Sequence, residues 1–166
     1  MIIFENNDKL NEAYQTSKIH LERMQFAYNK IKLHFPLDLE VYREICNEEI
    51  SFFDQFIFRF SKLQDTIGSK LFISVLNNLG EDTKGVAFID IVMRLEKLQI
   101  IESAEDWFKL REIRNILTHE YPFHQHEIVD GLNMLYSHYD VLIDIWKQLE
   151  IFINRKFSYL IKNSLL

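Results

Sequence analysis

The sequence predicts an all-α fold, an up-and-down antiparallel helical bundle with four main helices and one short extra helix. The 166-residue chain contains only 4 Gly and 2 Pro, whereas ordinary usage would give roughly 20 of these residues together. A β-sandwich or barrel needs many turns, and therefore many such residues, so both classes are excluded. Apolar residues recur at helical spacing along most of the chain, and its length suits a single domain over residues 1–166.

The first predicted helix runs from about Asp8 to near His34. Its apolar residues recur at steps of three and four, which is typical of an amphipathic helix with one buried stripe. Pro36 ends this helix, because the residue before a proline is forced out of the α region. The stripe consists of Leu10, Tyr14, Leu21, Met24, Tyr28 and Ile31, with Ser17 as its polar interruption.

Asp38 is the predicted N-cap of a second helix, which continues to Gly80 with Gly68 as the place where it can bend. Gly80 and Gly85 then bracket a loop before the next helix. The apolar residues assigned to the second helix are Val41, Ile45, Phe52, Phe53, Phe56, Phe60, Leu63, Leu71, Val75 and Leu79.

Five phenylalanines crowd residues 52–60 of this helix. We interpret them as part of the core or of a dimer seam rather than as a platform for stacked bases. Arg59 lies inside the run, and three roles are open to it. Its side chain extends past the apolar neighbours to solvent, or it pairs with Glu49 or Asp65, or it helps to bind phosphate. The first two roles are favoured. The phenylalanines are Phe52, Phe53, Phe56, Phe58 and Phe60. Cys46, in the same predicted helix, is expected to be buried.

Three more helices complete the predicted bundle. A short third helix ends near Gln99, and Ser103 is the N-cap of a fourth, with Asp106 in the capping-box position. Pro122 stops the fourth helix, and the last helix, the longest, follows with the alternating steps of a bundle seam. The apolar residues are Ile89, Val92, Met93 and Leu95 in the third helix, Trp107, Leu110, Ile113 and Leu117 in the fourth, and Ile128, Leu132, Leu135, Tyr139, Leu142, Trp146, Leu149 and Ile153 in the last.

Charge and cysteine content exclude several classes of protein. The formal net charge is −6, so the chain is no general polyanion binder, and any contact with nucleic acid must be local. The single Cys46 excludes an intrachain disulfide and a cysteine-based zinc site, which fits a reducing compartment. The opening residues turn polar at once, and no apolar run approaches the roughly 18 to 20 residues of a membrane helix. We expect a soluble, cytoplasmic protein with no membrane or DNA partner.

The end of the fourth helix, Arg111–Pro122, carries the residues that favour a specific chemistry. At about 100° per residue, Arg114, Thr118 and Tyr121 share one face, and His119 lies roughly 140° from Arg114. His119 falls in the last turn, where exposed carbonyl groups favour the imidazolium form. A guanidinium that holds a phosphate, one turn from a histidine that transfers protons, suits a phosphodiester substrate.

This segment resembles the R-x4-6-H motif of the HEPN superfamily. More closely, it resembles the R-N-x-x-x-H-x-Y form found in toxins paired with minimal nucleotidyltransferases, the HepT–MNT systems. The matching residues are Arg114, Asn115, His119 and Tyr121. A bare R-x4-H arises by chance in roughly a quarter of such sequences, but the full pattern in on the order of one in a thousand. The all-α bundle of the family also agrees with the predicted fold.

The resemblance implies a metal-independent endoribonuclease that needs no cofactor. Arg114 and His119 would act on the scissile phosphate of an RNA substrate, with attack by the neighbouring ribose 2′-hydroxyl. Family members dimerise with the two motifs facing across a cleft, which implies a homodimer. The nucleotidyltransferase antitoxin of the family adds AMP units to the motif tyrosine, here Tyr121, and the added anion would occupy the phosphate position beside Arg114. Asn115 either hydrogen-bonds the substrate or holds the helix pair together.

Other classes of function compete with this interpretation. The chain is alternatively a non-catalytic module that binds a nucleotide or a nucleotidyltransferase through the motif, which the net charge of −6 favours. A third possibility is a structural bundle with a fortuitous motif. A zinc site at His119, His124 and His126 is disfavoured, because no cysteine is near and no H-x3-H spacing occurs on a helix, so we expect no metal.

Overall fold

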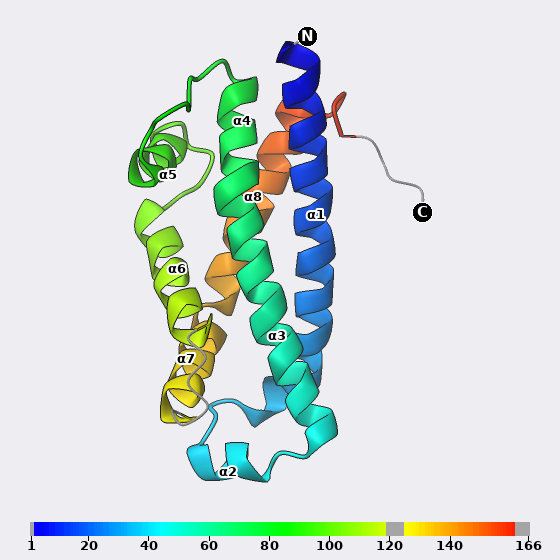
Figure 1. Cartoon of the computed structure of the whole chain (residues 1–166), viewed down its shortest axis with the longest axis vertical. Coiled ribbons are helices and arrows are strands. Elements are labelled where there is room, and N and C mark those ends of the chain that lie inside the picture. The colour runs from blue at the N-terminus through cyan, green and yellow to red at the C-terminus, as the bar shows by residue number, and fades with distance from the viewer. Residues whose placement is uncertain (1, 119–124, 162–166) are drawn as a thin grey trace.

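The computed structural model describes residues 2–118 and 125–161, and it confirms the all-α helical bundle (Figure 1). Its helical elements are α1 (Ile2–Ile31), the 3₁₀ turn η1 (Lys32–His34), α2 (Leu39–Glu44), α3 (Asn47–Thr66), the π-helical turn η2 (Ile67–Leu71), α4 (Phe72–Asn78), α5 (Phe88–Lys97), α6 (Ala104–Thr118), α7 (Gln125–Ser137) and α8 (Tyr139–Phe157). The described residues contain no strand.

The helices are arranged around a common apolar core. α1 and α3 pack side by side along the long axis, α4 continues the line of α3, and α8 runs behind them (Figure 1). α5, α6 and α7 follow one another down the other side. Buried apolar side chains from each of these helices form one cluster, so every long helix buries one face against the others.

The predicted stripe of the first helix is confirmed in its main residues. Leu10, Met24 and Ile31 are completely buried in α1. The helix begins earlier than expected, at Ile2. After α1 and η1 the backbone becomes extended at Phe35, directly before Pro36, as the restriction on residues that precede proline requires.

The prediction of one helix from Asp38 to Gly80 is wrong, because the chain breaks at Ile45 and Cys46. Asp38 is the N-cap, and its Oδ1 accepts a hydrogen bond from the Glu40 amide at 2.7 Å. Ile45 and Cys46 are both extended, and α3 starts afresh with Glu48 and Glu49 in its first turn. Two carboxylates beside the positive end of a helix dipole favour a new start there. Cys46 is exposed, so the prediction of its burial is also wrong.

The bend allowed at Gly68 coincides with the π-helical turn η2 between α3 and α4. A Cβ atom on Gly68 would lie 3.2 Å from Trp107 Cζ2 and 3.3 Å from Phe88 Cζ, closer than ordinary van der Waals contact. The glycine therefore allows α5 and α6 to approach the α3–α4 junction. This close approach shapes the surface hollow described below.

The predicted apolar side of the third helix is partly wrong. Ile89 and Met93 of α5 are 53 % and 52 % exposed, whereas Ile91, Val92 and Leu95 are buried. Ile89 and Met93 are one turn apart and share a face, which here points to solvent. The prediction combined two faces of one helix.

The fourth helix matches its prediction closely. The Ser103 hydroxyl accepts a hydrogen bond from the Asp106 amide at 3.1 Å, as expected of an N-cap. The four apolar residues predicted for its buried side are all buried: Trp107, Leu110, Ile113 and Leu117. This burial fixes the rotation of α6, and with it the direction of the polar side chains near the C-terminal end of the helix.

The last predicted helix is two helices, α7 and α8, with a break at His138. The Ser137 hydroxyl donates to the Met134 carbonyl at 2.9 Å, and His138 Nδ1 lies 2.8 Å from the same oxygen. The His138 amide also donates to the Met134 carbonyl at 3.1 Å, so this backbone hydrogen bond is kept and the chain departs from regular helix only at His138. The seam itself is confirmed, because Leu132, Leu135, Leu142, Trp146, Leu149 and Ile153 are all buried.

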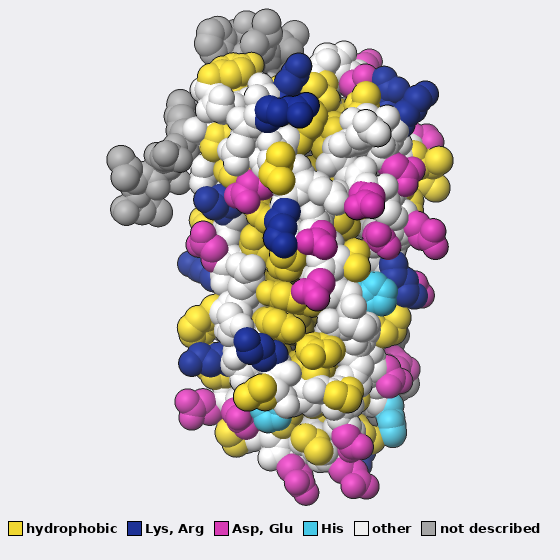
Figure 2. Space-filling view, turned by 180° about the vertical axis from the view of Figure 1, so that it is seen from behind, with side chains coloured by type: hydrophobic (Ala, Val, Ile, Leu, Met, Phe, Trp, Pro, Cys, Tyr) yellow, Lys and Arg dark blue, Asp and Glu magenta, His cyan; other side chains and the backbone are white. Residues whose placement is uncertain are grey.

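The face opposite that of Figure 1 exposes hydrophobic side chains between charged ones along much of its length (Figure 2). At the end of the chain, Ile151 of α8 is 67 % exposed and Tyr159 is 76 % exposed. Apolar surface thus remains available for contact with another chain. Within the described ranges, no helix is long and apolar enough to cross a membrane.

Asn133 of α7 fixes the connection between η1 and α2. Its Oδ1 accepts from the Leu37 amide at 2.6 Å, and its Nδ2 donates to the Leu37 carbonyl at 2.8 Å. Because Leu37 is buried, Asn133→Ala leaves two backbone groups unpaired, and we expect the free energy of unfolding to fall by about 1 to 3 kcal/mol. Urea denaturation measures this loss. Asn133→Asp places a carboxylate oxygen against the Leu37 carbonyl oxygen and should lose at least as much as Asn133→Ala; parent-like stability of either variant would contradict the assignment.

Candidate functional site

The structure describes two of the four predicted site residues. Arg114 and Asn115 lie in the last turns of α6, which ends at Thr118. His119 and Tyr121 lie outside the described residues, so their roles stay predictions. The candidate site is therefore built from Arg114 and the residues around it.

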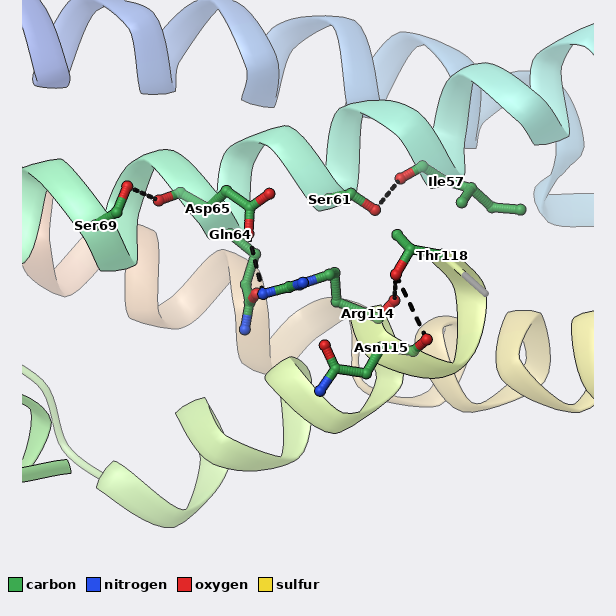
Figure 3. A network of polar contacts seen from close by, with 8 residues as sticks. All are labelled: Ile57, Ser61, Gln64, Asp65, Ser69, Arg114, Asn115 and Thr118. Carbon is green, nitrogen blue, oxygen red and sulfur yellow. Dashed lines mark hydrogen bonds and ion pairs between the residues drawn. The ribbon is translucent and has the colours of Figure 1, made fainter. Parts of the chain in front are cut away.

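Arg114 crosses from α6 to α3, where two side chains fix its guanidinium (Figure 3). Arg114 Nε donates to Gln64 Oε1 at 3.2 Å, and Arg114 Nη2 lies 3.1 Å from Asp65 Oδ1. The Arg114 side chain is 25 % exposed, whereas Gln64 is almost completely buried. The guanidinium is thus held in one orientation at the surface, with some of its five N–H donors still available to an anion.

Asp65 partly neutralises Arg114. The Asp65 side chain is 48 % exposed, and ion pairs that open to water contribute at most about 1 kcal/mol to stability. An anionic ligand can therefore exchange with Asp65 at small cost. Asp65 thus pairs with Arg114 and not with Arg59. Glu49, the other expected partner of Arg59, lies 3.5 Å from His34. The prediction that Arg59 forms an ion pair with Glu49 or Asp65 is therefore wrong.

The side chain of Asn115 takes no part in this network. It is exposed, and Figure 3 shows no interaction between its side-chain amide and Gln64 or Asp65. The Thr118 hydroxyl donates to the carbonyl of Arg114 at 2.9 Å and also lies 3.4 Å from that of Asn115, so Thr118 closes the end of α6. The Asn115 side chain makes no hydrogen bond to any other described residue, and its two expected roles stay predictions.

A hollow of about 260 Å³ lies beside Arg114, between the α3–α4 junction and α6. Arg111 stands one turn before Arg114 on α6, and its guanidinium lies 4.8 Å from the centroid of the Phe88 ring. Two permanent cations thus border one small depression. Its lining residues are Gln64, Asp65, Gly68, Ser69, Phe88, Trp107, Arg111 and Arg114.

Two lining residues carry buried donors without a hydrogen-bond partner among the described residues, Gln64 Nε2 and Trp107 Nε1. In Figure 3 the amide nitrogen of Gln64 points toward α6. A buried polar group that lacks a partner costs about 1 to 3 kcal/mol. Both donors are buried, so the cationic groups that border the hollow are the two guanidinium groups, and these favour an anionic ligand.

The sequence pattern did not single out Arg111, Gln64 or Trp107 as site residues. Arg111 had a local signal, since it lies three residues before Arg114 and so on the same face of one helix. Gln64 and Trp107 had none, because their proximity to Arg114 depends on how α3 packs against α6. Within the described parts of the chain, no three His, Cys, Asp or Glu side chains converge as metal ligands.

Comparison with known proteins adds no relative. No family model matches the chain, and neither a curated protein nor a solved structure matches it. Functional inference therefore rests on the residues and geometry of this chain.

Proposed function

We propose that this protein is a metal-independent endoribonuclease toxin, active in the cytoplasm, in which Arg114 and His119 act on the RNA phosphodiester. The observation that carries the proposal is the sequence pattern of Arg114, Asn115, His119 and Tyr121, whose first two members lie in the last turns of α6 in an all-α bundle. The exposed part of the Arg114 guanidinium, oriented by Gln64 and Asp65, gives further support.

The proposed reaction is an intramolecular transesterification. The ribose 2′-oxygen attacks the adjacent phosphorus, the P–O5′ bond breaks, and the products are a 2′,3′-cyclic phosphate and a free 5′-hydroxyl. A neutral imidazole accepts the 2′-hydroxyl proton, and an imidazolium donates a proton to the leaving 5′-oxygen. Arg114 hydrogen-bonds the non-bridging phosphate oxygens, where negative charge increases in the transition state.

A homodimer with facing motifs would supply two copies of His119, one for each proton transfer. The exposed apolar surface seen in Figure 2 is compatible with such an assembly. The proposed partner is a nucleotidyltransferase antitoxin of the MNT type. Its reaction would join the Tyr121 oxygen to the α-phosphorus of ATP with release of pyrophosphate, and the new anion would compete with RNA for Arg114.

Cleavage of RNA in the presence of EDTA tests this function. We expect the purified full chain to cut a 5′-labelled single-stranded RNA and to leave 2′,3′-cyclic phosphate ends, because no step needs a metal. His119→Ala should reduce the rate by about 10²-fold or more. His126→Ala is the matched control, since His126 is exposed at the start of α7, and it should cleave normally. Equal cleavage by the Arg114→Ala/His119→Ala double variant would end the proposal.

The second candidate function is a non-catalytic module that binds a nucleotide or a nucleotidyltransferase. The hollow beside Arg114 favours it, because the guanidinium groups of Arg111 and Arg114 suit a phosphate and the Phe88 ring beside them suits a base. The net charge of −6 also favours it. A chain that binds AMP in equilibrium dialysis, loses that binding in Arg111→Ala, and cuts no RNA in EDTA would establish this candidate instead.

A further inference from the structure

Four cationic or titratable side chains gather on the surface where α1 meets α3, and we call them the cationic patch: His20, Arg23, Arg59 and Lys62. Arg59 Nη1 donates to His20 Nδ1 at 3.2 Å. Phe58 lies against the patch and is 50 % exposed, and its ring centroid is 5.1 Å from Arg59 Cζ and 5.7 Å from Lys62 Nζ. An exposed aromatic ring therefore lies close to two cationic side chains.

The positive charges of the patch repel one another. Arg23, Arg59 and Lys62 form no ion pair with any described residue, although the chain as a whole carries −6. Burial first, and then Arg59, Lys62 and Arg23, lower the pKa of His20. Burial and Arg23 likewise lower the pKa of Arg59, whose Nε has no hydrogen-bond partner among the described residues. Besides burial, both shifts reflect repulsion between neighbouring cations, which a bound anion would relieve.

A second aromatic and cationic group continues the same α1–α3 surface. Phe26 of α1 and Phe52 of α3 meet edge to face at 6.1 Å between centroids. Lys30 Nζ lies 5.5 Å from the Phe26 centroid and 6.0 Å from that of Phe52. Phe26 is 53 % exposed. Cations and aromatic rings thus alternate along the surface.

The outer ridge of α3 connects the cationic patch with Arg114. Phe58, Lys62 and Asp65 follow one another at helical spacing, and Asp65 pairs with Arg114 on the far flank of the ridge. The two cationic sites therefore lie on the α1 and α6 flanks of α3. An α-helix with its side chains is about 10 Å wide, a width that a few nucleotides span. Asp54, one turn before Phe58, is a second carboxylate on this ridge and is exposed.

We propose that the cationic patch binds single-stranded RNA and guides it across α3 to Arg114, with phosphates on Arg23, Arg59 and Lys62 and one base stacked on Phe58. The inference rests on the proposed function, since it assigns a route for the same substrate. A single strand is favoured over a duplex because only an unpaired base offers its face to an aromatic ring. An acidic protein or an anionic membrane would use the charges but not the ring of Phe58.

Fluorescence anisotropy with a labelled 12-nucleotide RNA in EDTA tests the proposal, on the full chain carrying His119→Ala so that binding is measured without cleavage. Arg23→Glu/Lys62→Glu should weaken binding at least tenfold in about 100 mM salt and reduce the magnitude of the slope of log K against log salt by about 1.4, since two phosphate contacts to a single strand are lost. Arg155→Glu/Lys156→Glu, with the same charge change on exposed residues of α8, is the matched control. It should weaken binding less than threefold, and equal losses in both variants would overturn the proposal.

The ring of Phe58 separates RNA from other anionic partners. Phe58→Ala and Phe58→Leu should each weaken single-stranded RNA about tenfold, because leucine restores apolar area but offers no aromatic face. Both should leave the affinity for duplex RNA, a poly-glutamate peptide and phosphatidylserine vesicles unchanged. The inference would be overturned if Phe58→Ala bound single-stranded RNA as tightly as the parent chain does. It would also be overturned if the parent chain bound single-stranded RNA no more tightly than it binds those three probes. Tight, Phe58-dependent binding without cleavage by the His119-containing chain would contradict only the proposed nuclease function.

Discussion

Arg114→Ala is expected to reduce the rate of RNA cleavage by about 10²- to 10³-fold. This is the usual effect of removing one hydrogen-bond donor that stabilises the negative charge of the transition state. The guanidinium is the one cation of the motif whose surroundings the structure describes, and Gln64 and Asp65 direct it to the surface. Arg114→Lys should recover little activity, because a lysine ammonium cannot reproduce the planar pair of donors that Arg offers to phosphate. Single-turnover cleavage of labelled RNA in EDTA measures the rate, and growth inhibition on induction gives a second readout.

Asp65→Asn separates the catalytic loss from a structural one. Both Arg114→Ala and Asp65→Asn remove the ion pair between α3 and α6, but only the first removes the guanidinium. We expect Asp65→Asn to cleave RNA at least as fast as the parent chain, because the phosphate no longer competes with a carboxylate. If Asp65→Asn were as inactive as Arg114→Ala, the ion pair itself would be the requirement, and the proposed contact with phosphate would be contradicted.

Phe56→Ala is expected to lower the free energy of unfolding by about 3 to 5 kcal/mol, a large part of the stability of a domain of this size. Phe56 is completely buried in α3. Its ring centroid lies 5.6 Å from that of Tyr28 and 6.3 Å from that of Tyr139, so it joins α1, α3 and α8. The cavity left by the ring would remain largely unfilled, because side chains of three helices border it. Urea denaturation followed by circular dichroism measures the change.

Phe58→Ala is the matched control for Phe56→Ala. The two residues are two positions apart in one helix and undergo the same chemical change, but Phe58 is half exposed. We expect its stability loss to stay below about 1 kcal/mol, as is usual for surface substitutions. Similar losses for the two variants would mean that the rotation of α3 is wrong, and with it the assignment of Phe58 to the cationic patch.

Local signals in the sequence were sufficient to predict most of the fold. The spacing of apolar residues identified the buried faces of α1, α6 and the α7–α8 seam, and Asp38 and Ser103 marked two helix starts. The breaks at Cys46 and His138 were missed, because an apolar periodicity continues through both. At Cys46 a competing polar signal prevails, the acidic first turn of α3, whereas at His138 the backbone leaves the helical conformation at a single residue that no local signal marks.

The candidate site was less predictable, because it is assembled from residues distant in the sequence. Arg114 was found through its spacing to His119 within a single helix. Its partner Gln64 is 50 positions away, and no local pattern indicates that the two meet. The cationic patch was missed for the same reason: neither α1 nor α3 is basic, and the cations accumulate only where these two helices pack together.

In related chains, the residue at position 68 should affect the shape of the hollow beside Arg114 without preventing the bundle from folding. Its missing side chain leaves room for Trp107 and Phe88 to meet the α3–α4 junction. Alanine at this position would favour the helical backbone, yet its methyl group would push those rings outward and reshape the depression they border. Homologues with a larger residue at position 68 should therefore retain the bundle but accommodate different small molecules in the hollow. The size of the residue at this position would then indicate the size of the ligand.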